Sequence, residues 1–299
     1  MNITIKQLGV FAAIARHSSV SLAAEELCLS QPATSMALAE LERILGDKFF
    51  DRKGRKLQLN EKGRALMPMA IDCLNRVKEI SDKFSSGSHS LIGQVNIGCS
   101  TTIGNYVIPS LLGPFEQKSP DIDFDLVVKN SQTIIDEILK FNLDMGVIEG
   151  ICQEADIEVI PWRRDRLVVF THPKHPLANK EKVTVNDLED AEWILREGGS
   201  GSYEIFENAV KGKLKKVNIK FKLGHTEAIK NTVASGNGIS CLSILAIESM
   251  LERGELVEIP TPFLKLDRHF SLLIHRKKYR NEIIKSCLDF FKEQSDRSL

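Results

Sequence analysis

The chain has 299 residues, enough for two or three domains, and its hydrophobic content of 42% and charged content of 27% are normal for a well-packed soluble protein. No apolar run approaches the roughly 18 residues that a membrane span needs, and we find no signal peptide at the N-terminus. The six cysteines show no short paired spacing. We therefore expect reduced thiols, a cytosolic (cytoplasmic) location and no membrane partner.

The formal net charge is zero, with 40 Lys and Arg against 40 Asp and Glu, but the charges are unevenly spread. Residues 1–65 hold ten Lys and Arg against seven Asp and Glu, a balance of +3, so the rest of the chain carries −3. This modest asymmetry permits a DNA-binding N-terminal region without demonstrating one.

Three short helices are predicted at the N-terminus. The first, over residues 5–16, places apolar side chains at helical spacing. Ser19 or Ser21 can cap the second helix through its hydroxyl. Ser30 can cap the third, and Pro32 is tolerated in its first turn because the amide groups there lack partners anyway.

The third helix has an unusual outer surface. A helical wheel assigns one arc to the core: Ala33, Ala37, Leu38, Leu41, Ile44 and Leu45. Gln31, Pro32 and Ser35 lie on the other side, with Met36 at its edge. This surface is short, compact and neutral, which suits a helix that enters the major groove. There Gln can contact a base edge, Ser a phosphate, and the apolar carbons thymine methyls.

Residues 49–60 predict a strand, a glycine-containing turn and a second strand. Four basic residues occupy the tip of this hairpin: Arg52, Lys53, Arg55 and Lys56. Basic residues at a hairpin tip can simply favour solubility. After a helix-turn-helix pattern, we interpret the hairpin as a wing that reaches the DNA backbone and minor groove.

Residues 61–85 form the clearest periodic segment, a helix about 37 Å long at about 1.5 Å per residue. Apolar residues recur at heptad spacing: Leu66, Ala70, Cys73, Val77, Ile80 and Phe84. So narrow a seam favours a dimerisation helix, although packing on its own domain is the alternative. Pro68 should kink the helix or mark its effective start.

Beyond residue 90, strands alternate with helices, which predicts a parallel sheet covered on both faces and divided into two α/β subdomains of about 100 residues each. The expected strands are 94–100, 123–130, 143–150, 165–173, 193–199, 217–224, 238–243 and 268–276. The expected helices are 101–120, 131–141, 202–210, 226–236, 244–254 and 280–294. Such a sheet binds ligands at the carboxyl ends of its strands.

The segment 21–66 resembles the winged helix-turn-helix of LysR-type transcriptional regulators. The matching features are the double alanine 23–24, Ser30-Gln31-Pro32, Ser35, Leu41-Glu42 and Leu45-Gly46. The later order, a long helix followed by two α/β subdomains with a returning chain, also resembles that family. Met36 departs from the pattern, since the family often has a long polar or basic residue there.

The resemblance implies an α/β protein with three parts. These are a winged helix-turn-helix DNA-binding domain (1–60), a linker and dimerisation helix (61–88) and an effector-binding domain (89–299). The last resembles periplasmic binding proteins, with subdomain I over about 91–163 and 268–299 and subdomain II over about 164–267.

The implied partners are double-stranded DNA with a pseudo-palindromic operator, a small-molecule effector and a second copy of the chain. Homotetramers are common in the family, and RNA polymerase is a further expected partner. The residues expected to contact DNA are Ser21, Ser30, Gln31, Pro32, Thr34, Ser35, Met36, Arg52, Lys53 and Arg55.

The family binds its effector between the two subdomains, and several helix starts here carry hydroxyl or glycine residues. Each could be only an N-cap, but several together favour a small anionic metabolite. The candidate effector residues are Ser100, Thr101, Thr102, Asn130, Ser131, Glu149, Gly199, Ser200, Gly201, Ser202 and Thr226.

Alternative functions stay open at this stage. Cys99 and Cys152 could form a redox sensor, as in some family members. A small-molecule-binding protein or an enzyme could share the same α/β halves. We expect no enzyme, however, because the sequence shows no catalytic constellation and no cofactor motif. We also expect no metal, because prolines interrupt the pair His172 and His175 and no cysteine or carboxylate cluster accompanies it.

Overall fold

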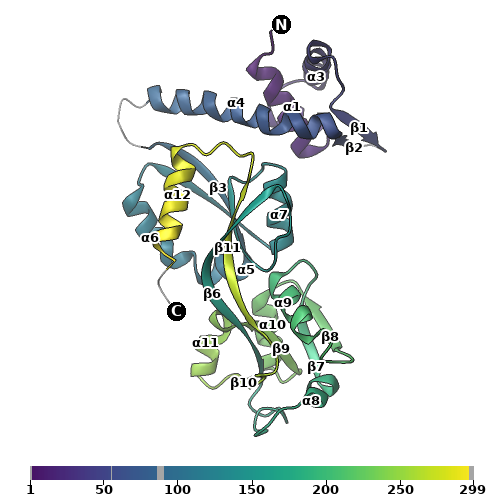
Figure 1. Ribbon diagram of the computed structural model, residues 1–299, viewed down its shortest axis with the longest axis vertical. Coiled ribbons are helices and arrows are strands. Elements are labelled where there is room, and N and C mark those ends of the chain that lie inside the picture. The colour runs from purple at the N-terminus through teal and green to yellow at the C-terminus, as the bar shows by residue number, and fades with distance from the viewer. Residues whose placement is uncertain (1, 55, 86–90, 296–299) are drawn as a thin grey trace.

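The computed structural model describes residues 2–54, 56–85 and 91–295 (Figure 1). Three parts follow one another along the chain: a small N-terminal helical unit, one long helix, and an α/β region whose two lobes share a sheet. Arg55, at the expected tip of the wing, lies outside the described residues. Within them, no helix is both long and apolar enough to cross a membrane.

The N-terminal unit has the three expected helices, α1 (Ile5–His17), α2 (Val20–Glu26) and α3 (Gln31–Leu45). Ser19 caps α2 by accepting a hydrogen bond from the Leu22 amide at 3.4 Å. Of the two alternatives, Ser19 is therefore the cap, and Ser21 lies inside the helix. Ser30 caps α3 as predicted, with its hydroxyl 3.3 Å from the Ala33 amide.

The wing is an antiparallel hairpin of β1 (Phe50–Lys53) and β2 (Lys56–Leu59), in which Lys53 pairs with Lys56 next to the turn. Phe11 anchors the unit: its side chain is fully buried and packs edge-on against Phe49, with ring centroids 5.7 Å apart. Burial of such a side chain contributes about 1.5–3 kcal/mol, so this aromatic pair holds the hairpin against α1.

The long helix α4 (Glu61–Ser85) runs through Pro68, so the proline does not mark its start. Its first half packs on the N-terminal unit, where Met67, Ala70 and Ile71 join the core that contains Phe11. In the second half, the remaining seam residues are exposed: Cys73, Val77, Ile80 and Phe84. The domain-packing alternative therefore describes the first half of α4, and the second half keeps an unpartnered apolar stripe.

The α/β region contains one mixed sheet with the order β4-β3-β5-β11-β6-β9-β7-β8, and β10 pairs with β6. Its strands are β3 (Gly93–Ser100), β4 (Ile122–Lys129), β5 (Met145–Glu149), β6 (Ile157–Thr171), β7 (Glu192–Arg196), β8 (Asn218–Leu223), β9 (Ile239–Ser243), β10 (Val257–Ile259) and β11 (Asp267–His275). The expected parallel pairing is present within each lobe, where β3 pairs with β4 and β5, and β7 pairs with β8 and β9. The sheet as a whole is mixed, because β6 and β11 run antiparallel to each other and cross between the two lobes. A repeating strand–helix pattern cannot reveal these crossing strands, since each pairs with residues far away in the chain.

The helices of this region are α5 (Thr101–Tyr106), α6 (Pro109–Lys118), α7 (Ser131–Leu139), α8 (Val185–Asp190), α9 (Gly201–Val210), α10 (Thr226–Ala234), α11 (Ile244–Glu252) and α12 (Glu282–Glu293). The helix expected over 101–120 is two helices, because Pro109 lacks an amide donor and begins α6 instead of continuing α5. Helix α8, strand β10 and the first half of β6 were not predicted.

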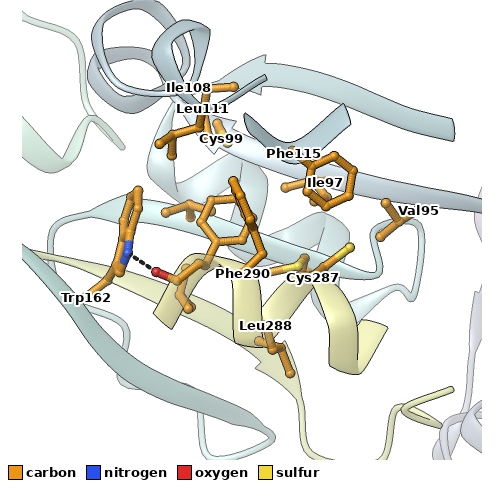
Figure 2. Close-up of a cluster of buried hydrophobic side chains, with 14 of the residues drawn as sticks. Val95, Ile97, Cys99, Ile108, Leu111, Phe115, Trp162, Cys287, Leu288 and Phe290 are labelled. Atoms are coloured by element: carbon orange, nitrogen blue, oxygen red, sulfur yellow. Dashed lines mark hydrogen bonds between the residues drawn. The ribbon is translucent and has the colours of Figure 1, made fainter. Parts of the chain in front are cut away.

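In the first lobe, α6 and α12 cover one face of the sheet and α7 covers the other (Figure 1). Figure 2 shows the core beneath α12, where Phe115 and Phe290 meet edge-on with ring centroids 5.2 Å apart. The indole Nε1 of Trp162 donates a hydrogen bond to the Phe291 carbonyl at 2.7 Å (Figure 2). The returning C-terminal helix is thereby fixed to the crossing strand β6.

Helix α4 also touches the first lobe. The Arg76 guanidinium lies 4.2 Å from the ring centroid of Tyr279, whose hydroxyl donates to Glu79 at 3.2 Å. Phe141, next to the end of α7, is buried among the apolar residues of the N-terminal core. The N-terminal unit with α4 and the α/β region of one chain are thus in direct contact.

Candidate DNA-binding surface and effector site

The N-terminal end of α3 presents the surface that the sequence indicates. Gln31, Pro32, Ser35 and Met36 are all exposed, and Met36 is 72% exposed. Most of the apolar Met36 side chain is in contact with solvent, so its burial contributes little to the stability of the monomer. These four side chains are available to a partner such as a DNA groove.

Thr34 is a correction to the expected set of DNA contacts. Its side chain is fully buried, and its hydroxyl donates to the Ser30 carbonyl at 3.1 Å. Ala33, expected in the core, is instead exposed. The buried face of α3 begins one residue later than the wheel placed it, because Thr34 satisfies its hydroxyl within the helix and can face inward.

The described basic residues of the wing lie at the surface. Arg52, Lys53 and Lys56 are exposed, and among the described residues none of the three is in an ion pair. Lys48, just before the hairpin, is by contrast bound to the Glu42 carboxylate at 2.7 Å. The free charges of the wing are therefore suited to contact phosphates.

The expected effector residues from the two lobes do meet. The Arg196 Nη2 atom lies 3.5 Å from the Thr101 hydroxyl. The Gln132 amide donates to the Gly199 carbonyl at 3.1 Å, and the Ile151 amide donates to Glu204 at 3.2 Å. We call this contact zone, between the first turns of α5, α7, α9 and α10, the subdomain junction.

At the subdomain junction, most hydroxyl groups already form hydrogen bonds within the protein. Ser100 and Thr102 both donate to the buried carboxylate of Glu149, Thr102 at 3.2 Å. Ser131 donates to the Glu149 carbonyl at 2.6 Å. Two of the three hydroxyls expected at an anion site here, those of Ser100 and Thr102, are therefore bonded to a carboxylate of the chain itself.

Asn130 and Thr226 are also hydrogen-bonded within the protein. Asn130 is an ordinary N-cap of α7, since its side-chain oxygen accepts the Thr133 amide at 3.0 Å. The Thr226 hydroxyl accepts from Arg196 Nη1 at 3.3 Å. Both residues lie at the subdomain junction, with their bonds satisfied in this structure.

The start of α9 differs from the other helix starts. Ser200 is 2% exposed, makes no capping bond, and its hydroxyl has no hydrogen-bond partner among the described residues. Gly199 has φ +83°, a conformation that favours glycine, and Gly201 packs directly on Glu149. A Cβ on Gly201 would overlap the Glu149 carbonyl oxygen. The two lobes therefore approach here through backbone contact.

Two buried arginines complete the junction, and neither was predicted from the sequence. Arg268 pairs with Asp165 at 2.6 Å and donates to the Ser202 hydroxyl at 3.0 Å. Its Nη2 atom is buried and has no hydrogen-bond partner among the described residues. Arg196, 2% exposed, holds both carboxylate oxygens of Glu197. Arg196 ends the apolar strand β7, and Arg268 stands near the start of β11. An arginine at either end of a buried strand is the signal that could have indicated both.

The cysteine alternative gains no support from the structure. Burial, with a smaller effect from the Glu149 carboxylate, raises the pKa of the Cys99 thiol far above its usual range. Burial also raises the pKa of the half-buried Cys152. Reactive cysteines need the opposite shift, because the thiolate is the nucleophile.

The two histidines considered for a metal have local structural roles. His172 Nδ1 accepts the Lys174 amide at 3.1 Å, and His175 Nδ1 accepts the Leu177 amide at 3.2 Å. The described part of the chain contains no group of three or more His, Cys, Asp or Glu placed to hold a metal ion.

A winged helix-turn-helix, a long connecting helix and a two-lobed α/β region define a DNA-binding transcriptional regulator with a ligand-binding domain. Residues 5–64 match the family model described as bacterial regulatory helix-turn-helix protein, lysR family, and residues 88–296 match the LysR substrate binding domain. The chain belongs to the LysR family of transcriptional regulators.

Curated relatives match this chain over almost its whole length. The chain is 40% identical over 290 residues to YeiE of Escherichia coli strain K12, an uncharacterized HTH-type transcriptional regulator, with 97% of each chain covered. It is 31% identical over 294 residues to the transcriptional activator CmpR of Synechocystis, covering 97% of this chain and 95% of that one.

Two solved structures have a similar fold. A full-length OxyR variant of Pseudomonas aeruginosa superposes with a TM-score of 0.73 at 22% identity, covering 100% of this chain and 99% of that one. The regulatory domain of Synechocystis CcmR, in complex with 2-PG, gives a TM-score of 0.64 at 30% identity, covering 69% of this chain and 98% of that chain.

Proposed function

We propose that this LysR-type regulator is controlled by a small anionic metabolite bound at the subdomain junction beside the start of α9. The carrying observation is a pair of buried donors without hydrogen-bond partners among the described residues, the Ser200 hydroxyl and Arg268 Nη2. Buried donors are costly to leave unpaired, so they favour an acceptor-rich ligand. The ten-residue helix α9 adds the partial positive charge of its N-terminus.

This assignment narrows the expected effector residues. Ser200, Gly201 and Ser202 stand at the start of α9, and Arg268 joins them through its bond to Ser202. Thr101, Asn130, Ser131 and Thr226 instead hold the surrounding elements in place through the bonds described above. The CcmR regulatory domain in complex with 2-PG supports a small-molecule ligand for the corresponding domain here.

Effector binding at the junction would change how closely the two lobes approach. The lobes are connected by the crossing strands β6 and β11, and the first lobe contacts α4 through Tyr279. A change in lobe closure can therefore reach the DNA-binding unit through packed contacts. The coupling from ligand to DNA would run along this path.

On the DNA side, we propose a homodimer that joins the exposed stripe Cys73, Val77, Ile80 and Phe84 of α4 with its counterpart in a second copy. Exposed apolar side chains at heptad spacing are the pattern that such pairing buries. Two recognition helices would then meet two half-sites of a pseudo-palindromic operator. Assembly into a tetramer and contact with RNA polymerase remain expectations from the family.

The anion site can be tested by thermal unfolding of the full chain with inorganic phosphate, glycolate and other small anions, at constant ionic strength set with chloride. A ligand of the folded state stabilises by RT ln(1 + [L]/Kd), about 2.7 kcal/mol at 100 times Kd. Ser200→Ala should lower the affinity for the anion about 10- to 100-fold. It should not destabilise the free protein, because the Ser200 hydroxyl has no hydrogen bond to lose. Ser235→Ala, on an exposed serine at the C-terminal end of α10, is the control. Stabilisation that Ser200→Ala leaves unchanged would remove this site.

The dimer is tested by light scattering on a sizing column. Ile80→Glu, at a 60% exposed position, should yield monomers because it buries a charge in the proposed seam. Leu22→Glu, at a 48% exposed position on α2, should leave the mass unchanged. Dimers that survive Ile80→Glu would place the interface elsewhere.

A further inference from the structure

Glu149, at the end of β5, has an unusual environment for a carboxylate. It is 1% exposed, yet within the described part of the chain its carboxylate accepts hydrogen bonds only from the hydroxyls of Ser100 and Thr102. Among the described residues, no cation pairs with it. The other buried acid of the region, Asp165, is bound directly to Arg268. A buried carboxylate without a cation is costly, so this position calls for an explanation.

The backbone of Glu149 is fixed beside the start of α9. Ser131 donates to the Glu149 carbonyl at 2.6 Å, and a Cβ on Gly201 would lie 2.9 Å from Glu149 Cγ. Ser200 directly precedes Gly201 in the chain, and Arg268 bonds to Ser202, which directly follows it. The two unpaired donors, Ser200 and Arg268, are therefore linked to both sides of the contact between α9 and Glu149.

Such a site treats anions unequally. An ionised carboxylate has about four acceptor positions, and two hydroxyls leave about half of them open. An anion with its own O–H or N–H group can donate to an open position and form a strong charge-assisted bond. An anion without a donor is only repelled by the negative charge of Glu149, and the repulsion is strong because little water is present to screen it.

We infer that Glu149 makes the effector site selective for anions that carry a hydrogen-bond donor, such as a protonated oxyanion, a hydroxycarboxylate or an aminocarboxylate. The inference rests on the proposed anion site beside α9. Anions that lack a donor, such as sulfate and acetate, are rejected by the same residue. Glu149 is therefore the specificity-determining residue, while Ser200 and Arg268 bind the anionic oxygens.

The test compares two matched pairs of anions by titration calorimetry on the full chain at neutral pH. Inorganic phosphate keeps a proton where sulfate has none, and glycolate has a hydroxyl that acetate lacks. The wild-type protein should bind the donor-bearing member of each pair at least about tenfold more tightly. In Glu149→Gln the preference should fall to about one or reverse, because the amide can donate to sulfate.

Glu248→Gln, which removes an exposed carboxylate on α11, is the charge-matched control and should keep the wild-type preference. Failure of every anion to bind the wild-type protein would overturn the anionic effector itself, and the selectivity with it. Equal binding within both pairs would leave the anion site standing and refute the role of Glu149. A Glu149→Gln protein that binds all four anions more weakly by the same factor would show a merely structural residue, which also refutes the inference.

Discussion

The recognition surface of α3 and the subdomain junction use similar residues in opposite ways. On α3, Gln31 and Ser35 are exposed and none of the bonds described above uses their side chains. At the junction, Ser100 and Thr102 are buried and bonded within the protein. A surface that must read DNA keeps its polar groups in water until the partner arrives. A site between two lobes must satisfy most of its polar groups internally, and only the remainder is offered to a ligand.

The recognition surface and the subdomain junction should respond differently to substitution. Changes on the recognition surface should alter DNA affinity with little effect on the free energy of unfolding, because little is buried there. Changes to the bonded buried groups at the junction should alter stability first, since each of these groups supports another. The following substitutions test that contrast.

The largest effect is expected from Arg268→Leu, which leaves Asp165 buried without its cation. Both side chains are essentially inaccessible, at 1% and 0% exposure, so the loss should be about 3–5 kcal/mol in the free energy of unfolding. Urea unfolding followed by tryptophan fluorescence measures it, since Trp162 and Trp193 both lie in the α/β region.

Arg166→Leu, in the pair with Glu258 whose side chains are 49% and 38% exposed, should cost only about 0–1 kcal/mol. Replacing Asp165 by Leu as well should restore much of the stability lost in Arg268→Leu, since no charge is then left unpaired. Equal losses for Arg268→Leu and Arg166→Leu would contradict the contrast between junction and surface.

Gly201→Ala should have the next largest effect. The new methyl group would overlap the Glu149 carbonyl oxygen, so the lobes would have to move apart, at about 1–3 kcal/mol. Gly198→Ala, three residues earlier, has nothing within 4 Å of its new Cβ and should stay within about 0.5 kcal/mol. The same urea titration compares them. A harmless Gly201→Ala would mean that the lobes are not in firm contact.

On the recognition surface, Gln31→Ala should weaken specific DNA binding by about 1–3 kcal/mol without a change in unfolding, because a lost base contact costs that much. Fluorescence anisotropy on a duplex selected from a random pool by the wild-type protein measures the affinity.

Thr34→Val, on the buried side of the same helix, should instead lower the free energy of unfolding by about 0.5–1.5 kcal/mol, because the hydrogen bond to the Ser30 carbonyl is lost. If Gln31→Ala unfolds the protein, the exposed face of α3 has been assigned wrongly.

The same contrast explains what could be predicted from the sequence. The exposed recognition residues lie on one short helix, so spacing along the chain was enough to group them, apart from the one-residue error at Thr34. The junction residues lie close together in the structure, but their bonding could not be predicted from the sequence. Ser100 reaches Glu149 across 49 positions, and Arg268 reaches Asp165 across 103 positions. No local pattern encodes such pairs, nor the crossing strands β6 and β11 that bring them together.

The smallest effect is expected at Asp187, a partly exposed acid in the capping box of α8. Its carboxylate accepts from Lys180 at 2.6 Å and from Thr184 at 2.8 and 2.7 Å, more donors than Glu149 has. The Lys180 bond, followed by those from Thr184, lowers the pKa of Asp187 from 3.8 to about 2.

Because the folded-state pKa is depressed, the stabilisation by Asp187 is complete above about pH 4 and is lost as the pH falls through 2. Solvent screening reduces it to about 1 kcal/mol or less. Asp187→Asn should therefore cost that amount at neutral pH, and its difference from wild type should shrink as the pH falls below about 4 in urea titrations. A loss as large as that of Arg268→Leu would show that the number of hydrogen bonds, and not burial, determines the cost of removing a charged group from this domain.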